Sequence, residues 1–204
     1  MKSSSICYKR RRFPPQVIAH AVWLYFRFNL SLREVEEMLL QRGIDVSYET
    51  VRRWVIKFGP AVARSLRQRQ NRLGDVWHLD EVAVRISGRK YWLWRAVDQN
   101  GIVLDEILQR RRDTKAAKRE IAPGVEHRSH KGLNNRAENS HLPFRKRERA
   151  MLGYRSQGSL QKFVSIHSAI RNCFFVPSRR RSALTIRYHR LEAFDTWNAV
   201  TQAA

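Results

Sequence analysis

The sequence has few features that would place it outside the cell or in a membrane. It contains only two cysteines, Cys7 and Cys173, which are too few for a disulfide framework or a cysteine-based zinc cluster. No apolar run approaches the roughly 20 residues that a membrane-spanning helix needs. The basic start leads into Pro14-Pro15 instead of an apolar signal core. We therefore expect a soluble, cytoplasmic protein.

Acidic residues are also scarce, and they are unevenly distributed. The chain has 18 Asp and Glu against 40 Lys and Arg, a net charge of +22. Residues 1–74 carry +10 and residues 127–204 carry +11, whereas residues 75–126 are nearly neutral because they hold half of the acids. Such a charge favours binding to polyanions, and a hydrophobic content of 43% excludes a disordered basic tail. The acids of the middle segment are therefore candidates for chemistry on a phosphate-bearing substrate.

The first 74 residues have the pattern of three short helices. Apolar residues at helical spacing predict a first helix whose stripe runs from Val17 to Phe28. Ser31 and Glu34 form a capping box at the start of a second helix, which ends near Gly43. A third helix is expected from residue 47 onwards. Its expected buried positions are Val51, Trp54, Val55 and Phe58.

The expected exposed face of the third helix is basic, which is typical of the recognition helix in a helix-turn-helix. Such a helix enters the major groove of DNA, and flanking arginines can contact phosphates. A plain helical bundle with a solvated basic face is the alternative, but the clustering of cations favours DNA binding. The candidate DNA-binding residues are Tyr48, Thr50, Arg52, Arg53, Lys57, Arg64 and Arg67.

After residue 76 the apolar pattern changes from helical to extended. Residues 76–86, 91–98 and 102–108 are rich in Val, Ile, Trp and Leu, and Ser-Gly and Asn-Gly pairs separate them. The pattern predicts three antiparallel strands in a meander. Asp80 and Glu81 fall inside the first strand, where a carboxylate is costly unless something pairs with it. Only one of the two can enter a shared site, because neighbours on a strand point to opposite faces; an exposed, frayed strand is the alternative.

The segment 127–141 is polar and contains one acid, Glu138, among several cations. A salt bridge from Glu138 to Arg136 or Arg145 is the alternative to a functional role. Three histidines of the same segment could indicate a metal, but no cysteine or well-spaced fourth ligand accompanies them, so zinc is not expected. These histidines are His127, His130 and His141.

Four words of the sequence resemble DDE transposases of the insertion-sequence-six family. They are WHLDE (77–81), YWLWRAVD (91–98), QRRRD (109–113) and HRSHKGLNNRAENSH (127–141). The resemblance runs from the N-terminal helices nearly to the end, where residues 188–197 also fit. It implies a protein of α+β or α/β class, with an N-terminal helix-turn-helix and a ribonuclease H-like domain. It also implies transfer of DNA strands with two divalent ions, normally Mg²⁺.

The resemblance implies roles for particular residues. Asp80 matches the first catalytic acid and Glu138 the last, and both would hold metal. Arg145 matches the basic residue that follows the last acid and would steer a substrate phosphate, although Pro143 argues against one continuous helix here. The implied partners are double-stranded DNA, as terminal inverted repeats and target, and further copies of the chain. No membrane or small-molecule substrate is expected, and the implied location is the bacterial nucleoid.

The second acid of the family has no counterpart in this chain. In the family it ends a fourth strand, which lies before the NNRAEN word; here only the 20 residues 114–133 are available. A strand-crossover-strand unit takes roughly 30 residues or more. We therefore predict an internal deletion near Arg119 and Glu120, which an intact parent gene with extra codons there would support, and impaired catalysis. The alternative is a non-enzymatic DNA-binding remnant that occupies element ends or interferes with an intact transposase.

Three regions are expected: a helix-turn-helix region over 1–74, a ribonuclease H-like region over 75–175 without its fourth strand, and a C-terminal helical segment over 176–204.

Two late amphipathic stripes predict helices that pack on the sheet, and a leftover apolar face would be a subunit contact. The first stripe is Leu160, Phe163, Val164, His167 and Ile170, with His167 as a core histidine. The second is Leu184, Tyr188, Leu191, Phe194 and Trp197.

Overall fold

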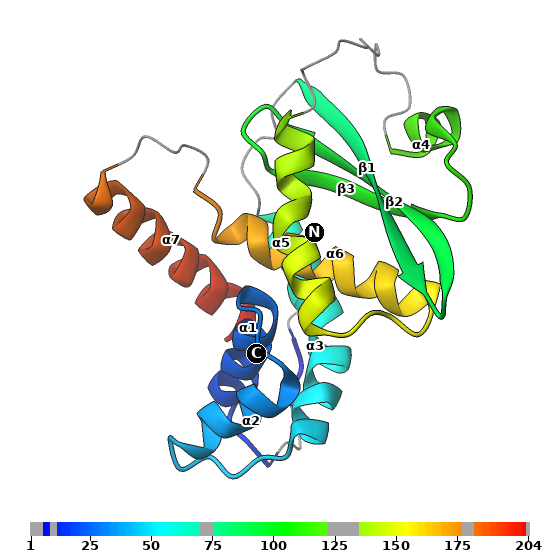
Figure 1. Cartoon of the computed structure of the whole chain (residues 1–204). Coiled ribbons are helices and arrows are strands. Elements are labelled where there is room, and N and C mark those ends of the chain that lie inside the picture. The colour runs from blue at the N-terminus through cyan, green and yellow to red at the C-terminus, as the bar shows by residue number, and fades with distance from the viewer. Residues whose placement is uncertain (1–5, 9–11, 70–75, 122–134, 177–181, 203–204) are drawn as a thin grey trace. The chain divides into compact units, whose positions relative to one another are not determined.

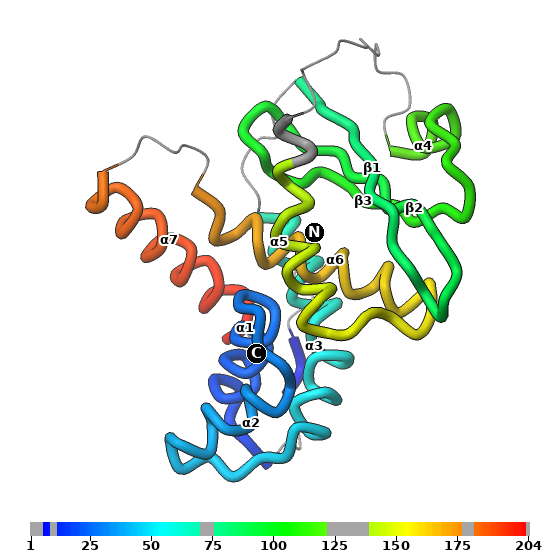
Figure 2. The backbone as a smooth tube through the Cα atoms, in the orientation of Figure 1, coloured from blue at the N-terminus to red at the C-terminus, as the bar shows by residue number. Residues whose placement is uncertain are grey.

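The chain forms two compact units (Figures 1 and 2). The computed structural model describes residues 6–8, 12–69, 76–121, 135–176 and 182–202, the side chains of 135–138 excepted. The first unit comprises Met1–Asn71 and Ile166–Ala204, and the second Arg72–Ser165. Within the described ranges, no helix combines the length and the apolar character needed to cross a membrane.

The first unit is helical. It contains α1 (Pro15–Arg27), α2 (Leu32–Leu40), α3 (Tyr48–Gln68), α7 (Ala183–Thr201) and the last part of α6 (Gln157–Cys173). The predicted capping box of α2 is confirmed, because the Glu34 N–H donates to Ser31 Oγ at 3.2 Å while the Ser31 N–H donates to the Glu34 carboxylate. Ser47 caps α3 in the same manner, with its Oγ accepting from the Thr50 N–H.

The core of the first unit follows the predicted pattern with one exception. The four predicted core positions of α3 are all buried: Val51, Trp54, Val55 and Phe58. Phe28, however, is 43% exposed. The prediction is wrong there because α1 ends at Arg27 and Phe28 is already extended, with φ −112° and ψ 165°. α3 continues through Pro60 as far as Gln68.

The second unit is built on a three-stranded antiparallel sheet in the order β1-β2-β3, which confirms the predicted meander. The strands are β1 (Trp77–Ile86), β2 (Arg89–Asp98) and β3 (Val103–Gln109). Ser87 and Gly88 connect β1 to β2 with positive φ values of 47° and 78°, as the two-residue turn of a twisted hairpin requires. β1 is an edge strand, and an isolated bridge joins its Ile86 to Tyr154.

Helices cover both faces of this sheet (Figure 1). On one face, α4 (Thr114–Ile121) packs on an apolar cluster from β2 and β3. Asp113 caps α4: its Oδ1 accepts from the Ala116 N–H at 3.0 Å. On the other face, α5 (Asn135–Ala150) contacts β1 and β2. The mixture of helices with a three-stranded antiparallel sheet agrees with the predicted fold class.

α5 is one continuous helix with Pro143 in its interior. The expectation that Pro143 interrupts the helix is therefore wrong. Proline removes one main-chain hydrogen bond and costs about 3 kcal/mol in a helix interior. Tertiary packing offsets this cost, because Phe144, directly after the proline, is fully buried.

The two late helices differ in how well their sequences predicted their packing. The stripe of α6 is confirmed, since Leu160, Phe163, Val164, His167 and Ile170 are all buried. The predicted packing of the α7 stripe is wrong, because Trp197 alone of its five members is buried. The buried side of α7 contains Ala193, Trp197 and Val200. It packs against α1 and α3 of the first unit, whereas the prediction placed it on the sheet.

Candidate functional site

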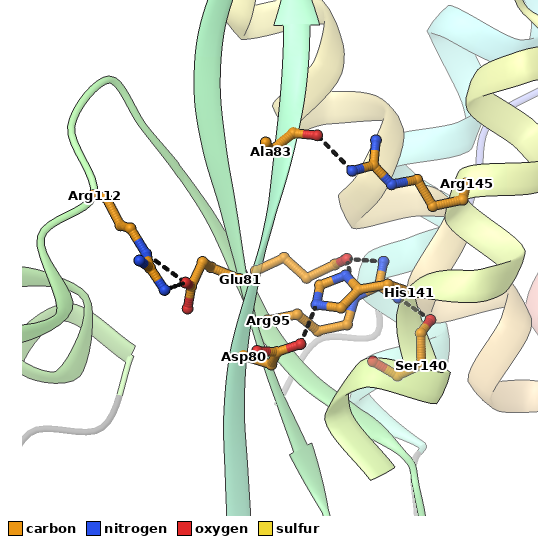
Figure 3. A network of polar contacts seen from close by, with 9 residues as sticks. Asp80, Glu81, Ala83, Arg95, Arg112, Ser140, His141 and Arg145 are labelled. Carbon is orange, nitrogen blue, oxygen red and sulfur yellow. Dashed lines mark hydrogen bonds and ion pairs between the residues drawn. The ribbon is translucent and has the colours of Figure 1, made fainter. Parts of the chain in front are cut away.

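Asp80 and Glu81 point to opposite faces of the sheet (Figure 3). Glu81 lies opposite Trp94, on the face that α4 covers, and its carboxylate accepts from Arg112 Nε at 2.6 Å. Asp80 is directed toward α5, and its side chain is 18% exposed. Of the two acids, Asp80 is therefore the one available to a site between β1 and α5.

A row of charged residues crosses the sheet beside Asp80. The strand register places Asp80 opposite Arg95, and Arg95 opposite Glu106. Arg95 is fully buried and donates from Nε to Glu106 Oε1 at 2.8 Å. Its Nη1 donates to the main-chain oxygen of Ser140 in α5 (Figure 3). One guanidinium therefore ties together β2, β3 and α5.

Sequence reasoning missed Arg95 and Glu106. The available signal was a pair of opposite charges, each in the middle of an apolar strand, which only the strand register brings side by side. Desolvation makes such charges costly unless they are paired with each other. In a three-stranded antiparallel sheet, the two charges therefore predict a buried ion pair.

His141 of α5 lies beside Asp80 (Figure 3). Its Nε2 is 3.6 Å from Asp80 Oδ2, its surface is 5% exposed, and no hydrogen bond within the described residues reaches either ring nitrogen. Burial, together with the positive charges of Arg95 and Arg145, lowers the pKa of His141 to about 3. The ring is therefore neutral near pH 7. The other two histidines of the motif, His127 and His130, lie outside the described residues.

Arg145 contacts the edge strand. Its Nη2 donates to the main-chain oxygen of Ala83 at 2.6 Å, and its Nη1 donates to Glu148 at 2.6 Å (Figure 3). Glu138 belongs to the same helix, seven residues earlier, but its side chain lies outside the described residues. In a continuous helix this spacing places positions 138 and 145 on one face, two turns apart.

Three further aspartates of the second unit have local structural partners. Asp98 Oδ1 accepts from the N–H groups of Asn100 and Ile102, and Asp105 Oδ1 accepts from the Glu106 N–H. Asp113 caps α4. Across the residues whose side chains are described, no cluster of three or more His, Cys, Asp or Glu could hold a metal ion.

Most candidate DNA-binding residues are exposed on α3. Tyr48 is 41% exposed and lies under the guanidinium of Arg33, 5.4 Å from ring centroid to carbon. Thr50 differs, because it is half-buried and its hydroxyl lies 3.1 Å from Ser47 Oγ at the helix cap. Five of the candidates are exposed cations: Arg52, Arg53, Lys57, Arg64 and Arg67.

Glu49 neutralises part of this basic face. It accepts two hydrogen bonds from Arg52, each 2.8 Å long, and lies 3.6 Å from Arg53 Nε. These contacts lower the pKa of Glu49, chiefly through the hydrogen bond from Arg52. Arg53 is the more accessible cation, with 75% of its side chain exposed against 54% for Arg52.

Comparison with known families agrees with the resemblance seen in the sequence. A family model described as a DDE domain matches residues 74–123 and 120–175. Together these segments cover half of the chain, so the protein belongs to this DDE-domain family. The match falls into two parts that meet at residues 120–123, which fits a shortened form.

Curated relatives carry the name transposase. They include the transposase for insertion sequence-like element IS431mec of Staphylococcus aureus strain N315 and the transposase for insertion sequence element IS257 in transposon Tn4003 of Staphylococcus aureus. Each is 34% identical to this chain over 110 residues, which are 54% of this chain and 49% of the relative. The chain therefore spans about half the length of the curated relatives it matches. No solved structure matches it significantly.

The buried ion pair should matter more to stability than the exposed one. Glu106→Ala leaves the Arg95 guanidinium buried without its carboxylate, and such a loss costs about 3–5 kcal/mol. Arg112→Ala removes a pair whose arginine is 63% exposed, so it should cost about 1 kcal/mol or less. Urea unfolding of both variants measures the difference, and equal losses would contradict the assignment.

His141 should make stability depend on pH. Its pKa is about 3 in the folded chain against 6.5 ordinarily, so below pH 6.5 the unfolded chain binds a proton that the folded chain does not. Stability is therefore full above about pH 6.5 and falls as the pH drops toward 3, by about 5 kcal/mol at most. His141→Gln should flatten this dependence in urea unfolding with a chelator present. His189→Gln on α7 is the control, and an unchanged slope for His141→Gln would refute the assignment.

Proposed function

We propose that this protein is a transposase-like protein of an insertion sequence, which binds the terminal repeats of the element and carries part of a site for DNA strand cleavage and transfer. The observation that carries the proposal is Asp80. It is an acid in a strongly basic chain, it lies inside the matched DDE region, and β1 directs it toward α5. The names of the relatives support the same function.

The proposed organisation keeps the regions expected from the sequence. Residues 75–175 form a ribonuclease H-like catalytic region without its fourth strand, and residues 176–204 form a C-terminal helical segment. The antiparallel meander with α5 across one face supports the first assignment. Residues 1–74 form a helix-turn-helix DNA-binding region, supported by the caps of α2 and α3 and the exposed cations of α3.

In this proposal α3 is the recognition helix. Its exposed arginines and Lys57 contact phosphates and bases, while Tyr48 and Thr50 lie near the start of the helix, where recognition helices meet base edges. Phosphate contacts supply affinity without sequence information, so they make binding sensitive to salt. Arg145 steers a substrate phosphate near the catalytic region.

The residues of this chain fit one divalent ion better than two. Asp80 and Glu138 would hold the ion, because Mg²⁺ prefers carboxylate oxygens. The chemistry that two bound ions supply in such sites is activation of the attacking oxygen and stabilisation of the leaving oxygen. Neutral His141 lies next to the Asp80 carboxylate, with its Nε2 3.6 Å from Asp80 Oδ2.

Catalysis is impaired in this proposal because the second acid is absent. Asp98, Asp105 and Asp113 are engaged in local hydrogen bonds, which argues against any of them as a substitute. The two-part family match supports a deletion near residues 119–120 as the cause. The alternative function, a non-enzymatic remnant that occupies element ends or interferes with an intact transposase, follows from the same missing acid. In both cases the protein acts on double-stranded DNA as a homo-oligomer.

A supercoiled plasmid that carries element ends tests catalysis. With Mg²⁺ or Mn²⁺ we expect cleavage at least about 100-fold slower than by a full-length staphylococcal relative, because a metal anchor that stabilises the transition state is missing. Asp80→Ala should leave this residual rate unchanged. Rapid cleavage that Asp80→Ala abolishes would show that the chain is a competent enzyme.

DNA binding is tested separately by fluorescence anisotropy over a salt series. Arg53→Gln should weaken binding to duplex DNA and reduce the slope of log affinity against log salt by about 1, the value for one lost phosphate contact. Arg85→Gln, which removes an exposed arginine of β1, is the matched control. Equal effects of the two substitutions would argue against α3 as the binding helix.

A further inference from the structure

α7 has a second apolar stripe, on the side away from the first unit's core. Leu184, Tyr188 and Leu191 are 61%, 59% and 51% exposed. At 100° per residue they lie almost opposite the buried positions Ala193 and Trp197. Single exposed apolar residues are ordinary, but three at spacings of four and three form the stripe of a helix that faces a partner.

The charged residues before and after Leu191, the last residue of this stripe, have opposite signs. Arg187 and Arg190 precede Leu191, and Glu192 and Asp195 follow it. Arg187 and Asp195 are each four residues from Leu191, and both are exposed. Two copies of this helix packed in parallel would place like charges together, whereas two antiparallel copies would place opposite charges together.

We propose that α7 packs against α7 of a second copy of this chain, antiparallel and centred on Leu191. In this register the two Leu191 side chains face each other, Tyr188 of each copy lies opposite Phe194 of the other, and Arg187 lies opposite Asp195. Leu184 lies at the end of the contact, opposite Asn198. The proposal rests on the homo-oligomer of the proposed function and specifies the surface that forms it. It does not require catalysis.

The size of the contact sets the expected strength. A helix of 19 residues is about 28 Å long, so one helix pair buries less than a standard protein interface. The contact should therefore be weak and depend on protein concentration. The aromatic side chain of Phe194 does not add to it freely, because its ring already packs near Trp23 and Phe174.

Sedimentation velocity of the nuclease-treated full chain tests the apolar part. Wild-type protein should show a monomer–dimer equilibrium, and Leu191→Glu should weaken it by at least about tenfold because it buries two like charges at the centre. Leu40→Glu, at a 58% exposed leucine of α2, is the matched control and should change nothing. A wild-type chain that remains monomeric overturns both the oligomer and this surface.

Charge exchange tests the antiparallel register. Arg187→Glu and Asp195→Arg should each weaken self-association by about tenfold, because each creates repulsive pairs. A mixture of the two variants should form a heterodimer, and the double variant should recover the wild-type affinity, since both restore opposite charges at every contact. A wild-type dimer that none of these changes affects would leave the oligomer in place but show that α7 does not form it. Folding of each variant is checked by circular dichroism.

Discussion

The geometry of the candidate site depends on the buried guanidinium of Arg95. A fully buried cation is tolerated only with partners of opposite charge or good acceptors. Arg95 finds one in β3, the carboxylate of Glu106, and one in α5, the Ser140 carbonyl. The second contact fixes where α5 crosses the sheet. His141, the next residue of α5, is thereby held beside Asp80.

The same cations that organise the site also set its electrostatics. Arg95 and Arg145 add to the effect of burial and hold His141 neutral, although a carboxylate lies 3.6 Å away. Both cations are themselves paired, Arg95 with Glu106 and Arg145 with Glu148. The charges around Asp80 thus come as buried or half-buried pairs, which is how a strongly basic chain tolerates them inside the second unit.

How much the sequence could predict depends on how local each signal was. The capping box at Ser31 and the turn at Ser87 involve residues that are neighbours in the chain, and both were predicted. The path of α5 through Pro143 and the exposed stripe of α7 depend on what each helix packs against, which periodicity does not contain. The pair of Arg95 with Glu106 needs the strand register. The placement of the Glu138 carboxylate relative to Asp80 remains a prediction, because that side chain lies outside the described residues.

Contacts among its own three strands and α5 order the sheet of the second unit. α5 is held by β2, where Arg95 pairs with Glu106 of β3 and donates to the Ser140 carbonyl, and by the outer edge of β1. That edge is itself partly covered, since Arg145 donates to Ala83 and a bridge joins Ile86 to the segment after α5. Such contacts reduce the tendency of an open strand to pair with other chains. The three strands and α5 therefore hold one another through the described contacts, and these contacts require no fourth strand.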